Sequence, residues 1–207
     1  CRDRGVRLIV DNSHGSHLRF HGTGELHPLS QGADVVIDSC HKTLPALTGS
    51  ALLHLNENVN PAPFCEALRI KSSTSPSFLI LAGLDAMYGE LTQDGVSAHK
   101  RLYERLEECR DRLAVHGYVF ERKDRDPYRL CLDTHNPDGL YSHLADKGMM
   151  CEYADKAGVI CIPSICNTEE DFALLESAVL DYPAPQPEIK DPLSYSERES
   201  VLSVRQA

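Results

Sequence analysis

"ADVVIDSCHKTLPALTG", residues 33–49, joins a short apolar run to a lysine and then to a turn. Residues 33–39 are mostly β-branched and apolar, a composition typical of a strand that is buried on both faces. Lys42 follows that run closely, behind Ser39 and His41. The stretch therefore predicts an α/β fold in which Lys42 lies just beyond the carboxyl end of a buried strand.

A second run of the same kind, "VRLIVD" at residues 6–11, ends at Asp11. His14 follows within a Gly- and His-rich loop that leads to the strand at 33–39. Ligands of open α/β sheets bind in the crevice beyond the carboxyl ends of the strands. If the two strands are neighbours, we expect Asp11 and His14 to lie close to Lys42.

This set of side chains suits one kind of cofactor chemistry. A lysine at a sheet edge can form a Schiff base with a carbonyl, and pyridoxal phosphate offers that carbonyl. The pyridine nitrogen of the cofactor needs an acidic partner, for which Asp11 is the candidate. Ser39 and His41 carry donors that suit a phosphate. A lone lysine after a strand is more often a solvated charge, and Asp11 at the matching strand end favours the cofactor interpretation.

The motif also resembles a known family. "DNSH" at residues 11–14 and "SCHKTL" at 39–44 are similar to the pyridoxal-phosphate segment of the Orn/Lys/Arg decarboxylases. The resemblance extends to "SSTSPSFLILAGLDAM" (72–87) and "CEYADKAGVICIPSICNTEEDF" (151–172). It implies that Lys42 is the Schiff-base lysine and that Asp11 pairs with the pyridine nitrogen. It further implies cofactor contacts for His14, Ser39 and His41, and a place for Glu152 near the distal group of the substrate.

The resemblance implies decarboxylation of arginine, lysine or ornithine to an amine that feeds polyamine synthesis, in a cytoplasmic homodimer or higher homo-oligomer. The implied fold is the C-terminal half of a fold-type-I large domain, like that of aspartate aminotransferase, followed by a small α/β domain. We expect residues 1–95 to belong to the large domain, 96–183 to the small one, and 184–207 to a linker or the start of a truncated C-terminal domain. The chain starts at Cys1 inside this scheme, so we interpret it as a fragment. Two alternatives stay open: another fold-type-I enzyme, such as an aminotransferase or an α-oxoamine synthase, and an inactive fragment.

Local patterns predict the remaining elements. A third strand is expected at 50–55, and two more at 128–134 and 158–164. Helices are expected at 75–91, with Ser75 as its cap, and at 98–115, 140–148 and 167–182. In the helix at 98–115 one apolar face points to the core, formed by Leu102, Leu106, Cys109 and Leu113.

Composition excludes several classes of protein. The net charge of −10 over 207 residues argues against nucleic acid as the main partner. No apolar run of about 18 residues predicts a membrane span. The eight cysteines form no CxxC pair, which indicates buried free thiols rather than a disulfide framework. The mixed-charge stretch at 121–126 reads as a solvated loop.

The histidines raise a metal alternative. His14, His17, His21 and His27 share one loop with Asp11 and Glu25, but no carboxylate or cysteine completes a known zinc pattern, so we predict no metal site. His54 is expected to be a satisfied core or edge residue of its strand, and His99 and His143 are expected at the surface.

Overall fold

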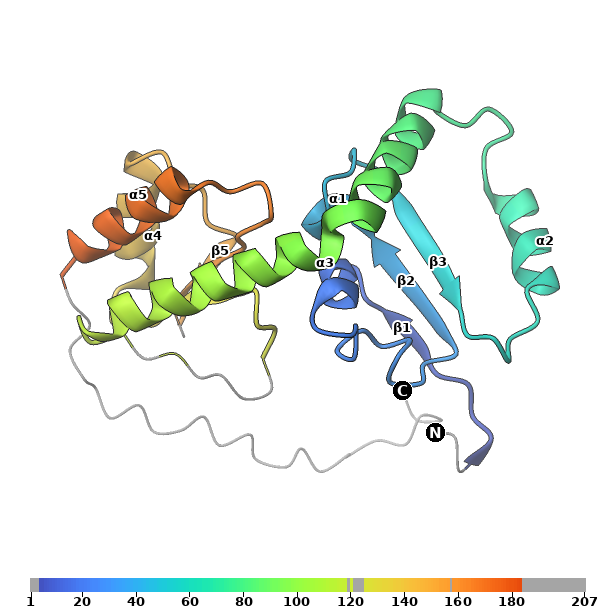
Figure 1. Ribbon diagram of the computed structural model, residues 1–207, viewed down its shortest axis with the longest axis horizontal. Helices are drawn as coiled ribbons and strands as arrows, with labels where there is room; N and C mark the ends of the chain where they lie inside the picture. Colours follow the sequence, from blue (N-terminus) through green and yellow to red (C-terminus); the bar gives the residue numbers. More distant parts are fainter. Residues whose placement is uncertain (1–3, 119, 121–124, 157, 184–207) are drawn as a thin grey trace, which may run out of the picture.

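The computed structural model describes residues 4–118, 120, 125–156 and 158–183, and it contains two three-stranded sheets (Figure 1). The first has the order β1-β2-β3, formed by Ile9–Asp11, Val35–Ser39 and Ala51–Leu55. β1 runs parallel to β2, and β3 runs antiparallel to it. The three strands confirm the predictions for this part of the chain. The parallel pair brings the ends of β1 and β2 to the same edge of the sheet.

Burial differs among these strands. β2 is the central strand and is largely buried, whereas the edge strands expose apolar side chains such as Ile9 and Leu53. The expectation that the strand at 6–11 is buried on both faces is therefore wrong for β1 in this chain, where Ile9 is 62% exposed.

A short helix follows each of the two parallel strands. The 3₁₀ segment η2 (Ser16–Phe20) comes after β1, and α1 (Cys40–Thr43) comes after β2. The chain leaving β1 is held by the Asn12 amide, which donates to the carbonyl of Ile37 at 2.8 Å. The two turns therefore lie beside each other, with Lys42 on α1.

Two helices were not foreseen in their true form. α2 (Ala62–Lys71) escaped the sequence analysis and has no buried residue. α3 (Phe78–Ala114) is one helix of 37 residues, where two helices were predicted. Its cap is Ser77 rather than Ser75, because the Ser77 side chain accepts from the amide of Ile80. Gly95 lies within α3 and lets Phe20 of η2 approach, since a Cβ there would lie 2.9 Å from that ring.

The second sheet carries the main core. Its strands β4 (Leu130–Leu132), β6 (Gly158–Cys161) and β5 (Tyr153–Asp155) are antiparallel in that order. α4 (Pro137–Asp146), α5 (Glu169–Leu180) and the last third of α3 pack around it (Figure 1). The sequence predicted these elements except β5. The predicted apolar face of α3 is confirmed, since its four members are at most 4% exposed: Leu102, Leu106, Cys109 and Leu113.

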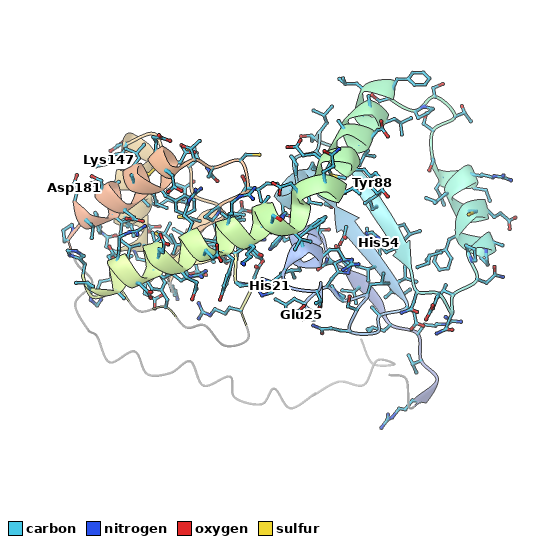
Figure 2. All side chains as sticks on the ribbon, viewed as in Figure 1. His21, Glu25, His54, Tyr88, Lys147 and Asp181 are labelled. Carbon is cyan, nitrogen blue, oxygen red and sulfur yellow. The ribbon has the colours of Figure 1, made fainter. Side chains whose placement is uncertain are left out.

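Capping groups fix the start of α5 and the end of α4. Thr168 and Asp171 form a reciprocal capping box at the start of α5. Gly148, with φ of +83°, follows α4 where a left-handed residue is needed. Beyond these ends, Lys147 donates to Asp181 at 2.7 Å, and Figure 2 shows the two residues together.

α3 connects the two sheets and passes through residues 95 and 96, where the domain boundary was predicted (Figure 1). The predicted linker at 184–207 lies outside the described residues. In the part of the chain that is described, no helix has the length and apolar character needed to cross a membrane.

Candidate functional site

A cleft of about 560 Å³ opens where β1 and β2 end. Its walls are formed by two segments close to these strand ends and by two residues of the second half of the chain: Asp11–Gly15, Lys42, Asp126 and Arg129. Three of the residues proposed from the sequence, namely Asp11, His14 and Lys42, therefore meet in one cleft. Their chemical roles stay predictions.

The Asp11 carboxylate is exposed and anionic. It accepts from the Ser13 amide at 3.0 Å and from the Ser13 hydroxyl. These bonds hold the pKa of Asp11 below its ordinary value, and the nearby charges of Lys42 and His14 act in the same direction. The cleft thus contains both an anionic carboxylate and the lysine amine.

Ser39 and His41 flank Lys42 in sequence but are not among the residues that line the cleft. Ser39 is the N-cap residue of α1, and its carbonyl accepts from the Ser16 hydroxyl at 3.3 Å. His41 donates from Nδ1 to the carbonyl of Ser50 at 3.0 Å. Both residues fix the turn that carries Lys42, and their contacts to a phosphate stay predictions.

Glu152 lies elsewhere. It is exposed next to β5, its backbone amide donates to the carbonyl of Ile160 at 2.8 Å, and it is not part of the cleft wall. Its contact with a substrate therefore stays a prediction, and Glu152 does not line the described cleft.

Asp126 and Arg129 were missed by the sequence analysis. Asp126 belongs to the stretch that was read as a solvated loop, which is wrong for this residue; residues 121–124 lie outside the described part. Its side chain is 20% exposed and accepts from Nε2 of His17 at 3.0 Å. Burial raises the pKa of Asp126, but the hydrogen bond and charge of His17, the bond from the Tyr128 amide and the charge of Arg129 together outweigh it, so the pKa is lowered overall.

Arg129 joins this carboxylate to the strand ends. It donates to the carbonyl of His14 at 2.7 Å and pairs with Asp126 at 3.5 Å. The arginine is 13% exposed. The sequence did contain a signal for Arg129. This residue directly precedes the apolar run of β4, so it lies at the start of a strand rather than in a solvated loop.

Behind the cleft, Asp38 of β2 forms a buried network that no motif suggested. One carboxylate oxygen accepts from Nε2 of His27 at 3.0 Å and from Nε2 of His54 at 2.9 Å. The other accepts from the Asn12 side chain at 2.7 Å. Burial raises the pKa of Asp38, yet these three bonds hold it well below its ordinary value. Figure 2 shows His54 on β3, and its satisfied position agrees with the prediction.

The same three residues could be read as a metal centre, because ligand atoms of His27, Asp38 and His54 lie within 4.8 Å of one another. The hydrogen bonds argue against it. The Leu29 amide donates to Nδ1 of His27, so Nε2 carries the proton and donates to Asp38. A ligating histidine instead needs a free lone pair on one nitrogen and an acceptor beside the other. The cluster is therefore a hydrogen-bonded carboxylate.

The other loop histidines are engaged separately. His17 bonds Asp126, and Nδ1 of His21 lies 3.1 Å from the hydroxyl of Tyr128. His99 was expected at the surface and is instead 1% exposed, stacked on Phe20 with a bond to the carbonyl of Gly95. His143 is also half-buried, and its Nε2 donates to the carbonyl of Ala178. Both expectations fail because α3 and α4 place these side chains on inward-facing sides.

The chain is similar to known decarboxylases in sequence. Residues 2–124 match the family described as "Orn/Lys/Arg decarboxylase, major domain". The arginine decarboxylase of Halalkalibacterium halodurans is 29% identical over 86% of this chain and 40% of that protein. That of Bacillus subtilis is 27% identical over 85% of this chain and 39% of that protein. This chain thus spans about 40% of the length of these relatives.

Solved structures give the same fold. The lysine decarboxylase of Francisella novicida superposes with a TM-score of 0.66 at 16% identity, covering 84% of this chain and 32% of that one. A serine palmitoyltransferase of Sphingomonas wittichii superposes with a TM-score of 0.64 at 16% identity, covering 87% and 48%. These similarities confirm the predicted fold class.

Proposed function

Because the chain belongs to the Orn/Lys/Arg decarboxylase family, we propose that its parent protein removes the α-carboxyl group of a basic amino acid with the help of pyridoxal phosphate. The single observation that supports this most strongly is the convergence of Lys42 and Asp11 in one cleft at the ends of two parallel strands. Curated relatives named arginine decarboxylase favour arginine as the first substrate to test, with lysine and ornithine next. The amine product would serve polyamine synthesis.

The residues of the cleft fit the cofactor. Pyridoxal phosphate needs a primary amine for its carbonyl and an acidic partner for its pyridine nitrogen, and an imidazole can pack beside its ring. Lys42, Asp11 and His14 supply them in a space of about 560 Å³. Ser39 and His41 remain candidates for the phosphate because they adjoin Lys42 on the same turn.

When bound, the cofactor supplies a carbonyl for attachment and an electron-accepting ring for the pair released as carbon dioxide leaves. The side chains of the cleft supply the remaining groups. Lys42 Nζ offers the amine for attachment and returns once the product has gone. The Asp11 carboxylate would hold a proton on the pyridine nitrogen, and its lowered pKa keeps it anionic for that task. His14, on the segment that follows β1, would lie beside the ring.

Arg129 and Asp126 would close the cleft from the side of the second sheet. Their bonds to His14 and His17 hold the segments together across the two halves of the chain. The apolar side chains that β1 and β3 expose, including Ile9 and Leu53, support coverage by further protein, either the rest of the parent chain or a second subunit of a homodimer.

Reductive trapping tests the cofactor part of the proposal. The protein is incubated with pyridoxal phosphate, reduced with borohydride and mapped by mass spectrometry, and the label is expected on Lys42. Lys42→Ala should lose the label, whereas Lys71→Ala, on the exposed helix α2, should retain it. Labelling spread over many lysines, unchanged in Lys42→Ala, would contradict the site and would support the inactive-fragment alternative.

Carbon dioxide release tests the reaction. The full-length protein with pyridoxal phosphate should release it from arginine, lysine or ornithine without an acyl donor, and Lys42→Ala should lower the rate by about 10³-fold or more. Release that requires an acyl-CoA would identify an α-oxoamine synthase instead. Transfer of the amino group to an oxo acid would identify an aminotransferase.

A further inference from the structure

Cys151 and Cys161 face each other inside the second sheet. Cys161 ends β6, and Cys151 lies just before its antiparallel neighbour β5. Both are free thiols that are 8% exposed, and their Sγ atoms are 3.4 Å apart. A disulfide joins its sulfurs at about 2.05 Å, so the two need to approach by roughly 1.4 Å. The pair is thus positioned for a bond with little backbone movement.

A cavity gives access to this pair. It has a volume of about 260 Å³ and is lined by both cysteines together with Met150, Pro163 and Phe172, among others. A buried thiol without such an opening is inert because oxidants do not reach it. Here a molecule of the size of hydrogen peroxide can reach both sulfurs.

The protonation of the two sulfurs differs. The hydrogen bond between them lowers the pKa of Cys151 and, together with burial, raises that of Cys161. Thiolate character is therefore concentrated on Cys151, with the proton on its neighbour. In contrast, burial raises the pKa of Cys109 to about 12 and also raises that of Cys40. These two buried thiols stay protonated and unreactive.

We propose that Cys151 and Cys161 form a reversible redox site at which hydrogen peroxide oxidises the two thiols to a disulfide. The Cys151 thiolate attacks one peroxide oxygen, the O–O bond breaks, and the other oxygen leaves as hydroxide and takes up a proton to give water. Cys151 is then a sulfenic acid. The sulfur of Cys161 attacks it, the S–S bond forms, and the hydroxyl leaves with the Cys161 proton as a second water. Two thiols are oxidised and one peroxide is reduced.

The position of the pair connects it with the cleft. Cys161 lies opposite Leu130 in the β4–β6 ladder, and Leu130 follows Arg129, which lines the cleft. Cys161 of the redox site therefore lies on the strand next to β4, opposite the residue that follows Arg129 of the candidate site. The oxidation itself does not depend on the proposed decarboxylation, and its test needs no activity.

Peptide mapping tests the proposal on the complete chain. Cys65 and Cys166 are exposed, so both are replaced by serine to prevent cross-links between molecules. The protein is treated with hydrogen peroxide, remaining thiols are blocked with iodoacetamide, and the digest is analysed without reductant. We expect one linked species containing Cys151 and Cys161, lighter by about 2 Da than the reduced peptides together, which dithiothreitol reverses.

Two variants sharpen the outcome. Cys161→Ser should abolish the link and leave Cys151 as a sulfenic acid that dimedone labels. Cys131→Ser, a matched change in the neighbouring strand β4, should leave the link intact. Alkylation of both thiols after peroxide treatment, or a link from either to Cys109 or Cys131, would overturn the proposal. Since the assay on unaltered Cys151 and Cys161 is decisive alone, a variant that fails to fold does not weaken it.

Discussion

The side-chain amide of Asn12 donates to Oδ1 of Asp38 across 2.7 Å, and this bond ties the wall of the cleft to the buried centre of β2. Asn12 adjoins Asp11, whose carboxylate faces the cleft. Because Asp38 is in turn held by His27 and His54, the position of the segment after β1 rests on a network of buried hydrogen bonds.

Gly15 is needed for this bond, since a Cβ at residue 15 would lie 2.1 Å from Oδ1 of Asn12. We expect Gly15→Ala to displace Asn12 from Asp38 and to lower the free energy of unfolding by about 1–2 kcal/mol. Gly89→Ala is the matched control in α3, where a Cβ meets nothing within 4 Å. It should raise stability by up to about 1 kcal/mol, because alanine favours the helix. Urea unfolding followed by circular dichroism measures both, and equal effects would contradict the prediction.

Asp38→Asn should be more costly. An amide accepts fewer hydrogen bonds than a carboxylate and places its own donor against the N–H groups of His27 or His54. We expect the free energy of unfolding at pH 7 to fall by about 3 kcal/mol. Asp85→Asn, at an exposed carboxylate of α3, should change it by less than about 0.5 kcal/mol. A cost below about 1 kcal/mol for Asp38→Asn would mean that the network contributes little.

Arg129→Ala removes the donor to the carbonyl of His14 and the partner of Asp126. We expect a loss of about 2 kcal/mol in the free energy of unfolding, because both are charge-assisted contacts of a largely buried side chain. Arg101→Ala breaks an exposed ion pair with Asp94, which solvent screens, and should lower the free energy of unfolding much less than Arg129→Ala. Thermal unfolding of the two variants compares them directly. Similar shifts of the unfolding temperature would show that the contacts of Arg129 do not stabilise the fold more than an exposed ion pair does.

The burial of His99 predicts that the stability of the fold depends on pH. Burial is the main cause that lowers its pKa, so the folded protein favours the neutral imidazole. The unfolded chain has a histidine pKa of about 6.5, and protonation therefore favours unfolding as the pH falls below that value. We expect the free energy of unfolding to decline between about pH 6.5 and 5, and His99→Gln to reduce that decline. The exposed His116→Gln should leave it unchanged, and an equal decline in His99→Gln would refute the assignment.

Local sequence patterns predicted the elements that have a clear apolar run or a buried face. Alternating or continuous apolar runs predicted β1, β2, β3, β4 and β6, and the helix expected at 167–182 corresponds to α5. β5 and α2 were missed because one is short and the other has no buried face. The break predicted within α3 was wrong because Gly95 serves the approach of Phe20 there and does not end the helix.

The amino-acid sequence by itself indicated the α/β fold class, because a lysine after a buried strand and an aspartate at the end of another form a pattern that depends on local order along the chain. The family was indicated by the resemblance of its motifs to those of the Orn/Lys/Arg decarboxylases. The sequence also brought Asp11 and Lys42 into one hypothesis. Only the tertiary structure decided what surrounds them. Asp126 and Arg129 reach the cleft from the second half of the chain, and Asp38 meets His27 and His54 from three separate segments. Cys151, in the segment before β5, meets Cys161 at the end of β6 in the same way. Such contacts depend on how strands and helices pack in space, which no spacing of residues along the chain specifies.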